Sequence, residues 1–142
     1  MTGSPHDAAV GDELPHFRRA PDLDHWNRYA AVNYEFVPIH MDDEAGRAAG
    51  YASAFGMGNL QFSYLHNLLR QWVGDEGEVL ELSCQFRAAN VKGQVVTARG
   101  TVSDVRSDGA TRVLTLELWT EEQTGVRLAV GQARVAVTGE AD

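Results

Sequence analysis

The sequence predicts a single α+β domain in which an antiparallel sheet wraps around one long central helix. Apolar residues repeat at helical spacing from residue 57 to residue 73. After residue 77 the apolar pattern changes to strict alternation, which is typical of strands with one buried face. The helical stripe is wider than a surface helix needs, so we expect the later strands to cover it.

Composition narrows the class of protein. The chain has 142 residues, which suits one domain, with 44% hydrophobic and 23% charged residues. A net charge of −8 argues against a nucleic-acid partner, which needs a basic face. No apolar run reaches the roughly 18 residues of a membrane span, and the first residues lack the apolar core of a signal peptide. With a single cysteine, Cys84, the chain is expected to be cytoplasmic.

The chain divides into a domain and two short tails. Residues 1–9 are polar and small, which predicts a disordered N-terminal tail. Residues 10–138 are expected to form the domain, and residues 139–142 a C-terminal tail.

Four short elements are expected before the long helix. They are an edge strand, a helix, a loop and a second helix, at residues 14–19, 23–32, 34–40 and 44–49. Asp22 suits the N-cap of the first helix. Pro38 favours an extended residue before it and hence a loop. Gly50 suits the end of the second helix.

Four strands are expected after the long helix. Their alternating segments lie at about residues 80–86, 96–102, 114–118 and 126–137. Ser107-Asp108-Gly109 is a strong hairpin signal between the middle two strands. Small residues at Ala129, Gly131 and Ala133 would allow a helix or strand to approach closely. A sheet of this kind around one helix is the hotdog arrangement.

Three pieces of sequence resemble the MaoC-like (R)-specific enoyl thioester hydratases and dehydratases. The entry Val10–Pro15 is similar to the family's lead-in to its first strand. The run Tyr34–Asp42, YEFVPIHMD, is similar to the family motif Gly-Asp-x-Asn-Pro-(aliphatic)-His-x-Asp. Phe55-Gly56-Met57 stands where the family has His-Gly-Met. The resemblance covers about residues 10–138 and implies the hotdog fold.

The resemblance also implies a catalytic site. Glu35 matches the family's catalytic Asp, and His40 its catalytic His. These two residues would share one water, deprotonate it as it attacks C3 of a 2-enoyl thioester, and deliver a proton to C2. The backbone N–H of Gly56 would stabilise the enolate oxygen. Four family positions differ here. Glu35 is one methylene longer than Asp, Val37 replaces Asn, Tyr34 replaces Gly, and Phe55 replaces the His before Gly-Met.

Further residues are expected to bind substrate. Ser63 and Tyr64 lie near the position of a family hydroxyl contact, and Arg87 and Lys92 would meet a CoA phosphate. The other histidines lack ligand spacing, so we expect no metal, and the resemblance implies no cofactor.

Three functions remain open from the sequence. The first is hydration of 2-enoyl thioesters or dehydration of (R)-3-hydroxyacyl thioesters. The second is a non-catalytic hotdog subunit of a heteromeric hydratase, and the third is an acyl-CoA thioesterase. Under the first function, the acyl group would be a fatty chain or a steroid side chain, and the carrier would be CoA or a carrier protein. An open sheet edge predicts a homodimer or a heterodimer with another hotdog subunit.

Overall fold

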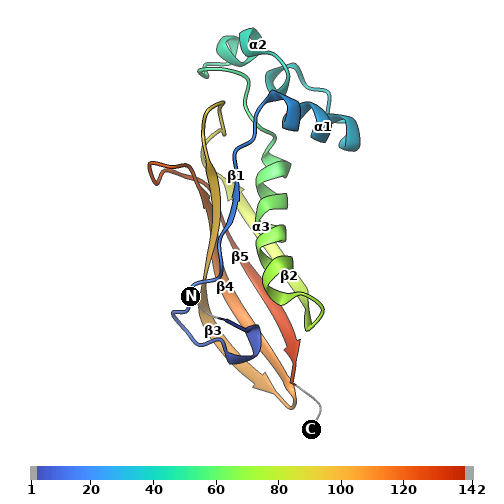
Figure 1. The fold of residues 1–142 in the computed structure, drawn as a ribbon, viewed down its shortest axis with the longest axis vertical. Helices are drawn as coiled ribbons and strands as arrows, with labels where there is room; N and C mark the ends of the chain where they lie inside the picture. The colour runs from blue at the N-terminus through green and yellow to red at the C-terminus, as the bar shows by residue number, and fades with distance from the viewer. Residues whose placement is uncertain (1–2, 140–142) are drawn as a thin grey trace.

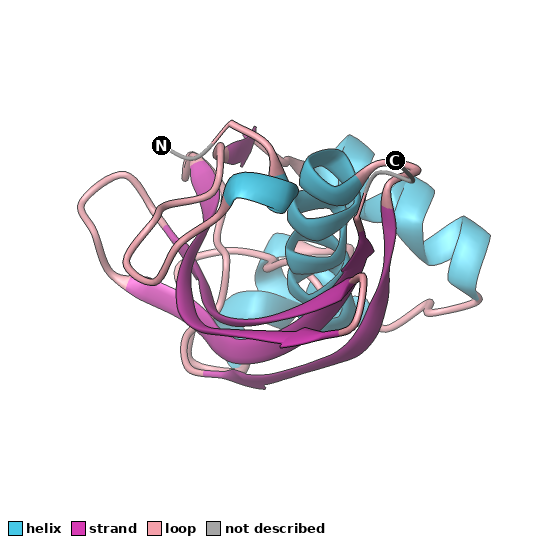
Figure 2. Ribbon diagram, turned by 90° about the horizontal axis from the view of Figure 1, so that it is seen from below, coloured by secondary structure: helices cyan, strands magenta, loops and turns pink. Residues whose placement is uncertain are grey.

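The computed structural model describes residues 3–139 and has the predicted architecture. A five-stranded antiparallel sheet curls around one long helix, α3 (Gly58–Val73) (Figures 1 and 2). The strands are β1 (Phe17–Arg19), β2 (Gly77–Phe86), β3 (Val96–Asp108), β4 (Thr111–Glu121) and β5 (Arg127–Thr138). Their order in the sheet is β1-β3-β4-β5-β2. The predicted hotdog fold is therefore confirmed.

The core lies between α3 and the concave face of the sheet. Helix α3 contributes a continuous apolar stripe that includes Leu65, Leu68, Leu69, Trp72 and Val73. The sheet contributes the inward residues of its alternating strands, among them Leu114, Leu116, Leu118, Val135 and Val137. Burying one such side chain stabilises the fold by about 1.5–3 kcal/mol. The apolar residues of the helical pattern and those of the alternating pattern thus pack together in one core.

The strand connections follow the turn signals of the sequence. Asp108 pairs with Thr111 across a tight β3–β4 hairpin, and Gly109 takes the positive φ of 62° that this turn requires. The close approach expected at Gly131 is made by the neighbouring strand. A Cβ at Gly131 would lie 2.1 Å from the carbonyl oxygen of Ser83 on β2. Only glycine therefore fits at this point of the β2–β5 pair.

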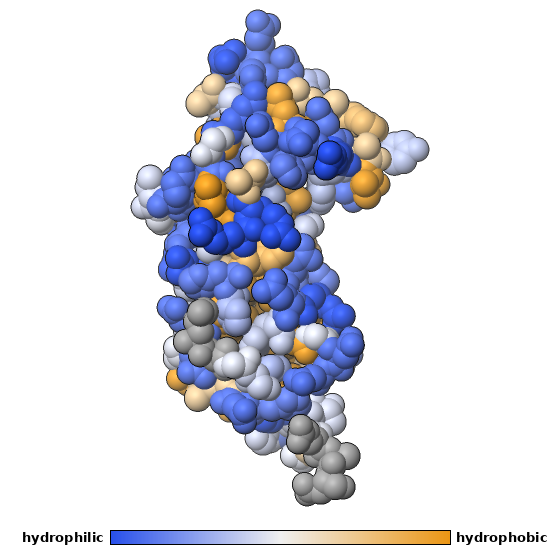
Figure 3. All heavy atoms as spheres, viewed as in Figure 1, coloured by the Kyte–Doolittle hydropathy of each residue, from blue (hydrophilic) through white to orange (hydrophobic). Residues whose placement is uncertain are grey.

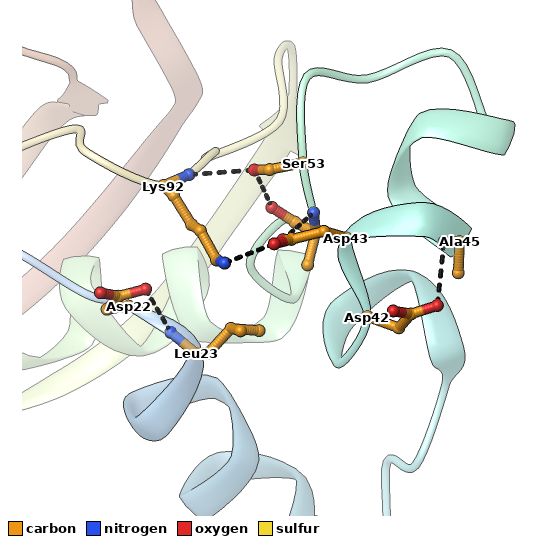
Figure 4. A network of polar contacts seen from close by, with 8 residues as sticks. Asp22, Leu23, Asp42, Asp43, Ala45, Ser53 and Lys92 are labelled. Atoms are coloured by element: carbon orange, nitrogen blue, oxygen red, sulfur yellow. Dashed lines mark hydrogen bonds and ion pairs between the residues drawn. The ribbon is translucent and has the colours of Figure 1, made fainter.

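Two shorter helices gather at the end of the molecule where α3 begins (Figure 1). Helix α1 (Leu23–Asn33) starts at its predicted cap, where the Leu23 N–H donates to the Asp22 carboxylate at 2.7 Å (Figure 4). Helix α2 (Asp43–Ala48) starts in the same way at Asp42. A 3-10 turn, η2 (Pro38–His40), connects them. This end of the molecule carries the predicted loop at residues 34–40, which contains Glu35 and His40.

The N-terminal segment differs from the expected disordered tail. Pro5–Asp7 forms a 3-10 turn, η1, and Ala8 is buried in the core. The Arg112 guanidinium on β4 donates to the carbonyls of Pro5, His6 and Ala8, the last at 2.7 Å. These charge-assisted bonds hold the segment against the sheet. Residues 1–2 and 140–142 lie outside the described residues. Of the predicted C-terminal tail, Gly139 is described, and its N–H donates to the Ala110 carbonyl at 2.6 Å.

Strand β2 is an open edge of the sheet. Among residues 3–139 this strand pairs with β5 alone. Leu80 and Phe86 on it are exposed by 43% and 52%. Within residues 3–139, no helix is both long and apolar enough to cross a membrane.

Candidate active site

His40 is a buried imidazole held in one orientation. It ends the turn η2, and only 8% of the residue is exposed. Its Nδ1 lies 2.7 Å from the carbonyl oxygen of Phe55. Because a carbonyl oxygen only accepts, Nδ1 carries the proton, and Nε2 of the neutral ring keeps its lone pair. The Phe55 ring packs edge-on against the imidazole at 5.2 Å. His40 is therefore positioned as a base with one free nitrogen.

The imidazole opens on a cavity of about 290 Å³ at the start of α3. This volume is near the lower end of the range of ligand pockets, about 300–1,000 Å³. The wall is formed by η2, the segment before α3, the first turn of α3 and the chain after β2. Its lining residues are His40, Tyr51, Phe55, Gly56, Gly58, Gln61, Phe86, Arg87, Ala88, Ala89 and Asn90.

Gly56 lies at the cavity, but its N–H is not available in the predicted role. It donates to the backbone carbonyl of Asn90 at 2.8 Å, which ties the two loops together. Helix α3 begins two residues later, at Gly58. As the first helical residue, Gly58 has no acceptor for its N–H within the helix, and no other described residue accepts from it. The Gly58 N–H is therefore an open backbone donor at this site.

Glu35 is half-buried and does not line the cavity. Its carboxylate makes no hydrogen bond or ion pair with any described residue, His40 included. The preceding residue, Tyr34, caps α1 in the left-handed region, with φ 56° and ψ 33°. Tyr34, which stands where the family motif has glycine, thus adopts a backbone region that glycine reaches more easily. The structure does not bring Glu35 and His40 into contact.

Of the two predicted phosphate contacts, Arg87 reaches the rim of the cavity and Lys92 does not. The Arg87 guanidinium donates to the Gln85 amide oxygen at 2.7 Å and has no acidic partner among the described residues. The Lys92 Nζ instead pairs with the Asp43 carboxylate at 2.7 Å. The backbone N–H of Lys92 donates to the Ser53 hydroxyl (Figure 4). Lys92 therefore braces α2 against the chain after β2.

Neither hydroxyl residue on α3 lines the cavity. The Ser63 hydroxyl donates to the Asn59 carbonyl one turn earlier, at 3.0 Å. Tyr64 is 6% exposed and packs on Phe17 of β1, with ring centroids 6.0 Å apart. Burial raises the pKa of the Tyr64 phenol to about 12. Both residues have local or packing roles in this structure.

Two amide side chains of the cavity wall were missed from the sequence. Gln61 is 3% exposed and Asn90 is 1% exposed. A signal for Gln61 was present, because it stands four residues from both Met57 and Leu65, which are fully buried. A polar residue inside an apolar helical stripe indicates a polar group in the interior. Asn90 lies in a loop, where periodicity carries no signal.

A larger hollow of about 580 Å³ lies on the opposite, convex face of the sheet. It is lined by β2, β4 and β5, and the Arg127 guanidinium stacks over the Trp119 ring there at 4.4 Å. None of the predicted site residues belongs to it. The cavity beside His40 is therefore the candidate active site.

Comparisons with solved structures agree with the fold. No family model and no curated protein matches the sequence. The (R)-hydratase from A. caviae involved in PHA biosynthesis has a similar structure, with TM-score 0.81 and 25% identity over 91% of this chain and 96% of that one. The MaoC-like dehydratase from Rhodospirillum rubrum has TM-score 0.84 and 18% identity over 99% and 100% of the two chains. A chain of the ChsH1-ChsH2 complex from Mycobacterium tuberculosis has TM-score 0.79 and 17% identity over 91% and 98%.

These likenesses show that the chain shares the fold of these structures, which is the fold that the sequence motifs predicted.

Proposed function

We propose that this protein hydrates 2-enoyl thioesters, or in reverse dehydrates (R)-3-hydroxyacyl thioesters, with an acyl-CoA or acyl-carrier thioester as substrate. The observation that carries the proposal is His40, a buried imidazole with a fixed tautomer that opens on a cavity beside the start of α3. The likeness to an (R)-hydratase agrees with this chemistry.

The proposed reaction needs one base and one site for negative charge. His40 Nε2 takes a proton from water as the water oxygen bonds to C3 of the substrate. The C2–C3 π electrons move toward the thioester oxygen, where the Gly58 N–H and the positive end of α3 stabilise the charge. The proton then passes from the imidazolium to C2. The product is the 3-hydroxyacyl thioester, and His40 returns to its neutral state.

Glu35 has a supporting role in this proposal. In the predicted mechanism it shares the water with His40, which requires its carboxylate to reach the cavity. A displacement of about 1 Å in a catalytic group can lower the rate on the order of 100-fold. Because Glu35 stands outside the cavity wall, we propose that His40 alone is indispensable and that Glu35 contributes less.

The test is an assay of the purified protein with crotonyl-CoA, followed by the loss of enoyl thioester absorbance. We expect His40→Ala to lower kcat by about 10²- to 10⁴-fold and Glu35→Gln to lower it less. His66→Ala is the matched control, since His66 is exposed on α3, and should leave kcat unchanged. Activity that is unaffected by His40→Ala would rule out the proposed base. Measuring free thiol in the same reaction tests the thioesterase alternative, for which we expect no release.

A second candidate function is a supporting subunit of a heteromeric hydratase. The position of Glu35 outside the cavity favours it, as does the likeness to a chain from a two-component complex. In that case the chain alone is inactive, and hydration appears only after mixing with a second hotdog chain. The His40→Ala variant in the mixture then separates the two cases, because a supporting subunit would keep the activity of the complex.

A further inference from the structure

Gln61 is a buried amide without a hydrogen-bond partner. Its Nε2 and Oε1 are both fully buried, and neither bonds to any described residue. The residue nevertheless lines the cavity that contains His40. More than nine in ten buried polar groups in proteins are paired, so an amide with both of its atoms unpaired calls for an explanation.

Packing does not explain why this position holds a glutamine. Met57, the N-cap of α3, and Leu65 lie four residues to either side of Gln61, and both are fully buried and apolar. An apolar residue of similar length would fill the same space and would leave no polar group unsatisfied. The glutamine therefore lowers the stability of the free protein, as functional groups often do.

The place of Gln61 on the helix points to the start of α3. It lies one turn after Gly58, on the same face, and helical side chains lean toward the helix N-terminus. The Gly58 N–H has no acceptor among the described residues. The terminal torsion of a glutamine rotates easily, so the NH₂ group can be turned toward the cavity that the residue lines. Two donors, one from the backbone and one from a side chain, then converge at the positive end of α3.

We propose that the Gln61 side-chain NH₂ and the Gly58 N–H together bind the carbonyl oxygen of an acyl thioester in this cavity. This inference rests on the proposed function for the class of ligand. It deepens that function by replacing the predicted donor, Gly56, whose N–H is held by Asn90. As the C2–C3 π electrons shift toward the oxygen, the two donors stabilise the negative charge. The carbonyl is restored when C2 takes up its proton.

Asn90 differs from Gln61 in what it can offer. Its NH₂ group already donates to the Val91 carbonyl and to the Gln94 side chain, and only Oδ1 is unpaired. Since Oδ1 only accepts, Asn90 cannot stabilise an oxyanion. Among the side-chain amides of this cavity wall, Gln61 is thus the one with a free donor.

The test uses a chromophoric ligand, 4-dimethylaminocinnamoyl-CoA, whose absorption moves to longer wavelength when its carbonyl is polarised. We expect a red shift when it binds the wild-type protein, and at most half of that shift in Gln61→Met. Gln71→Met, on an exposed part of the same helix, should keep the full shift. With crotonyl-CoA as substrate, Gln61→Met should lower kcat by about 10- to 100-fold, in the range of a lost oxyanion donor or below it.

Thermal unfolding separates this role from a structural one. Because Gln61→Met removes an unpaired buried amide, its Tm should equal or exceed that of the wild type. A lower Tm together with an unchanged red shift would show that the amide is structural and would overturn the inference. So would a wild-type protein that does not shift the probe.

The outcomes also separate the inference from the proposed function. Hydratase activity that Gln61→Met leaves unchanged, with an unchanged red shift, overturns the inference and keeps the function. A red shift that depends on Gln61, in a protein without hydratase activity, supports the inference and overturns the function.

Discussion

At the scale of single residues, Tyr34 stores strain next to the predicted catalytic pair. It is the one non-glycine residue with positive φ among residues 3–139, and its side chain is 88% exposed. A left-handed conformation costs an L-residue about 1–2 kcal/mol. Its ring makes only an edge contact with Phe36, at 6.1 Å, so packing offsets little of that cost.

Tyr34→Gly should therefore stabilise the protein by about 1 kcal/mol, after the larger unfolded-state entropy of glycine is allowed for. Equilibrium unfolding in urea measures the change. Tyr34→Ala is the matched control, because it removes the same ring but keeps the Cβ, and it should give no gain. Equal effects of the two substitutions would mean that loss of the ring, not relief of φ, sets the stability.

The residues of the site could be predicted only in part from the sequence. His40 and Gly56 reach the cavity as expected, because the spacing of the motif places them near the start of α3. Arg87, directly after β2, reaches its rim. The Gly56 N–H donates to the backbone carbonyl of Asn90, which lies in a loop after β2. Such a bond depends on how two distant loops meet, and no local pattern encodes it. Gln61 had a local signal, its polarity within an apolar stripe.

At the scale of elements, the helices and strands could be predicted from the spacing of their apolar residues and from their capping residues. The boundaries of α1, α2 and α3 lie within about one residue of those expected, because Asp22, Asp42 and the glycine steps mark them. Strands β3 and β4 run several residues beyond their apolar cores, since ladder hydrogen bonds continue to the hairpin. The N-terminal segment was not predicted, because its partner, Arg112, lies far away in the sequence.

The brace between α2 and the chain after β2 gives a prediction on pH. The Asp43 carboxylate accepts from Lys92 Nζ and from the Ala54 N–H, and these bonds lower its pKa below the usual 3.8. A carboxyl whose pKa is lowered on folding adds stability at pH values above the unfolded pKa. That contribution is lost as the pH falls through the folded value. We expect Asp43→Asn to lower Tm near neutral pH. The difference in Tm between wild type and variant, here called the gap, should disappear as the pH falls below 3.8.

Thermal unfolding across this pH range measures the gap. Asp104→Asn is the control, since Asp104 pairs at 3.0 Å with Arg106, whose side chain is 83% exposed. Such surface pairs add little stability, so Tm should hardly change. A gap for Asp43→Asn that stays constant down to acid pH would exclude the ionised carboxylate as its cause.

At the scale of the whole molecule, two surfaces remain open. Exposed apolar side chains gather on the end that carries α1 and α2, among otherwise hydrophilic surface (Figure 3). They include Val32, Phe36, Val37 and Met41. The second surface is the free edge of β2, where the backbone groups of one side have no strand to pair with. Unpaired edges of this length are rarely left open in native proteins.

We therefore expect two hotdog chains to associate edge to edge through β2, as a homodimer or with a different hotdog partner. Light scattering after size-exclusion chromatography should give twice the 15.5 kDa of one chain for the homodimer. Leu80→Lys places a charge on this edge and should shift the mass toward one chain, because a lysine at the contact resists desolvation. Val126→Lys, at the exposed turn between β4 and β5, should not. If the protein is a single chain alone, the same pair of variants is compared in complex with the partner hotdog chain. A Leu80→Lys variant that associates as the wild type does, in both settings, would place the interface elsewhere on the molecule.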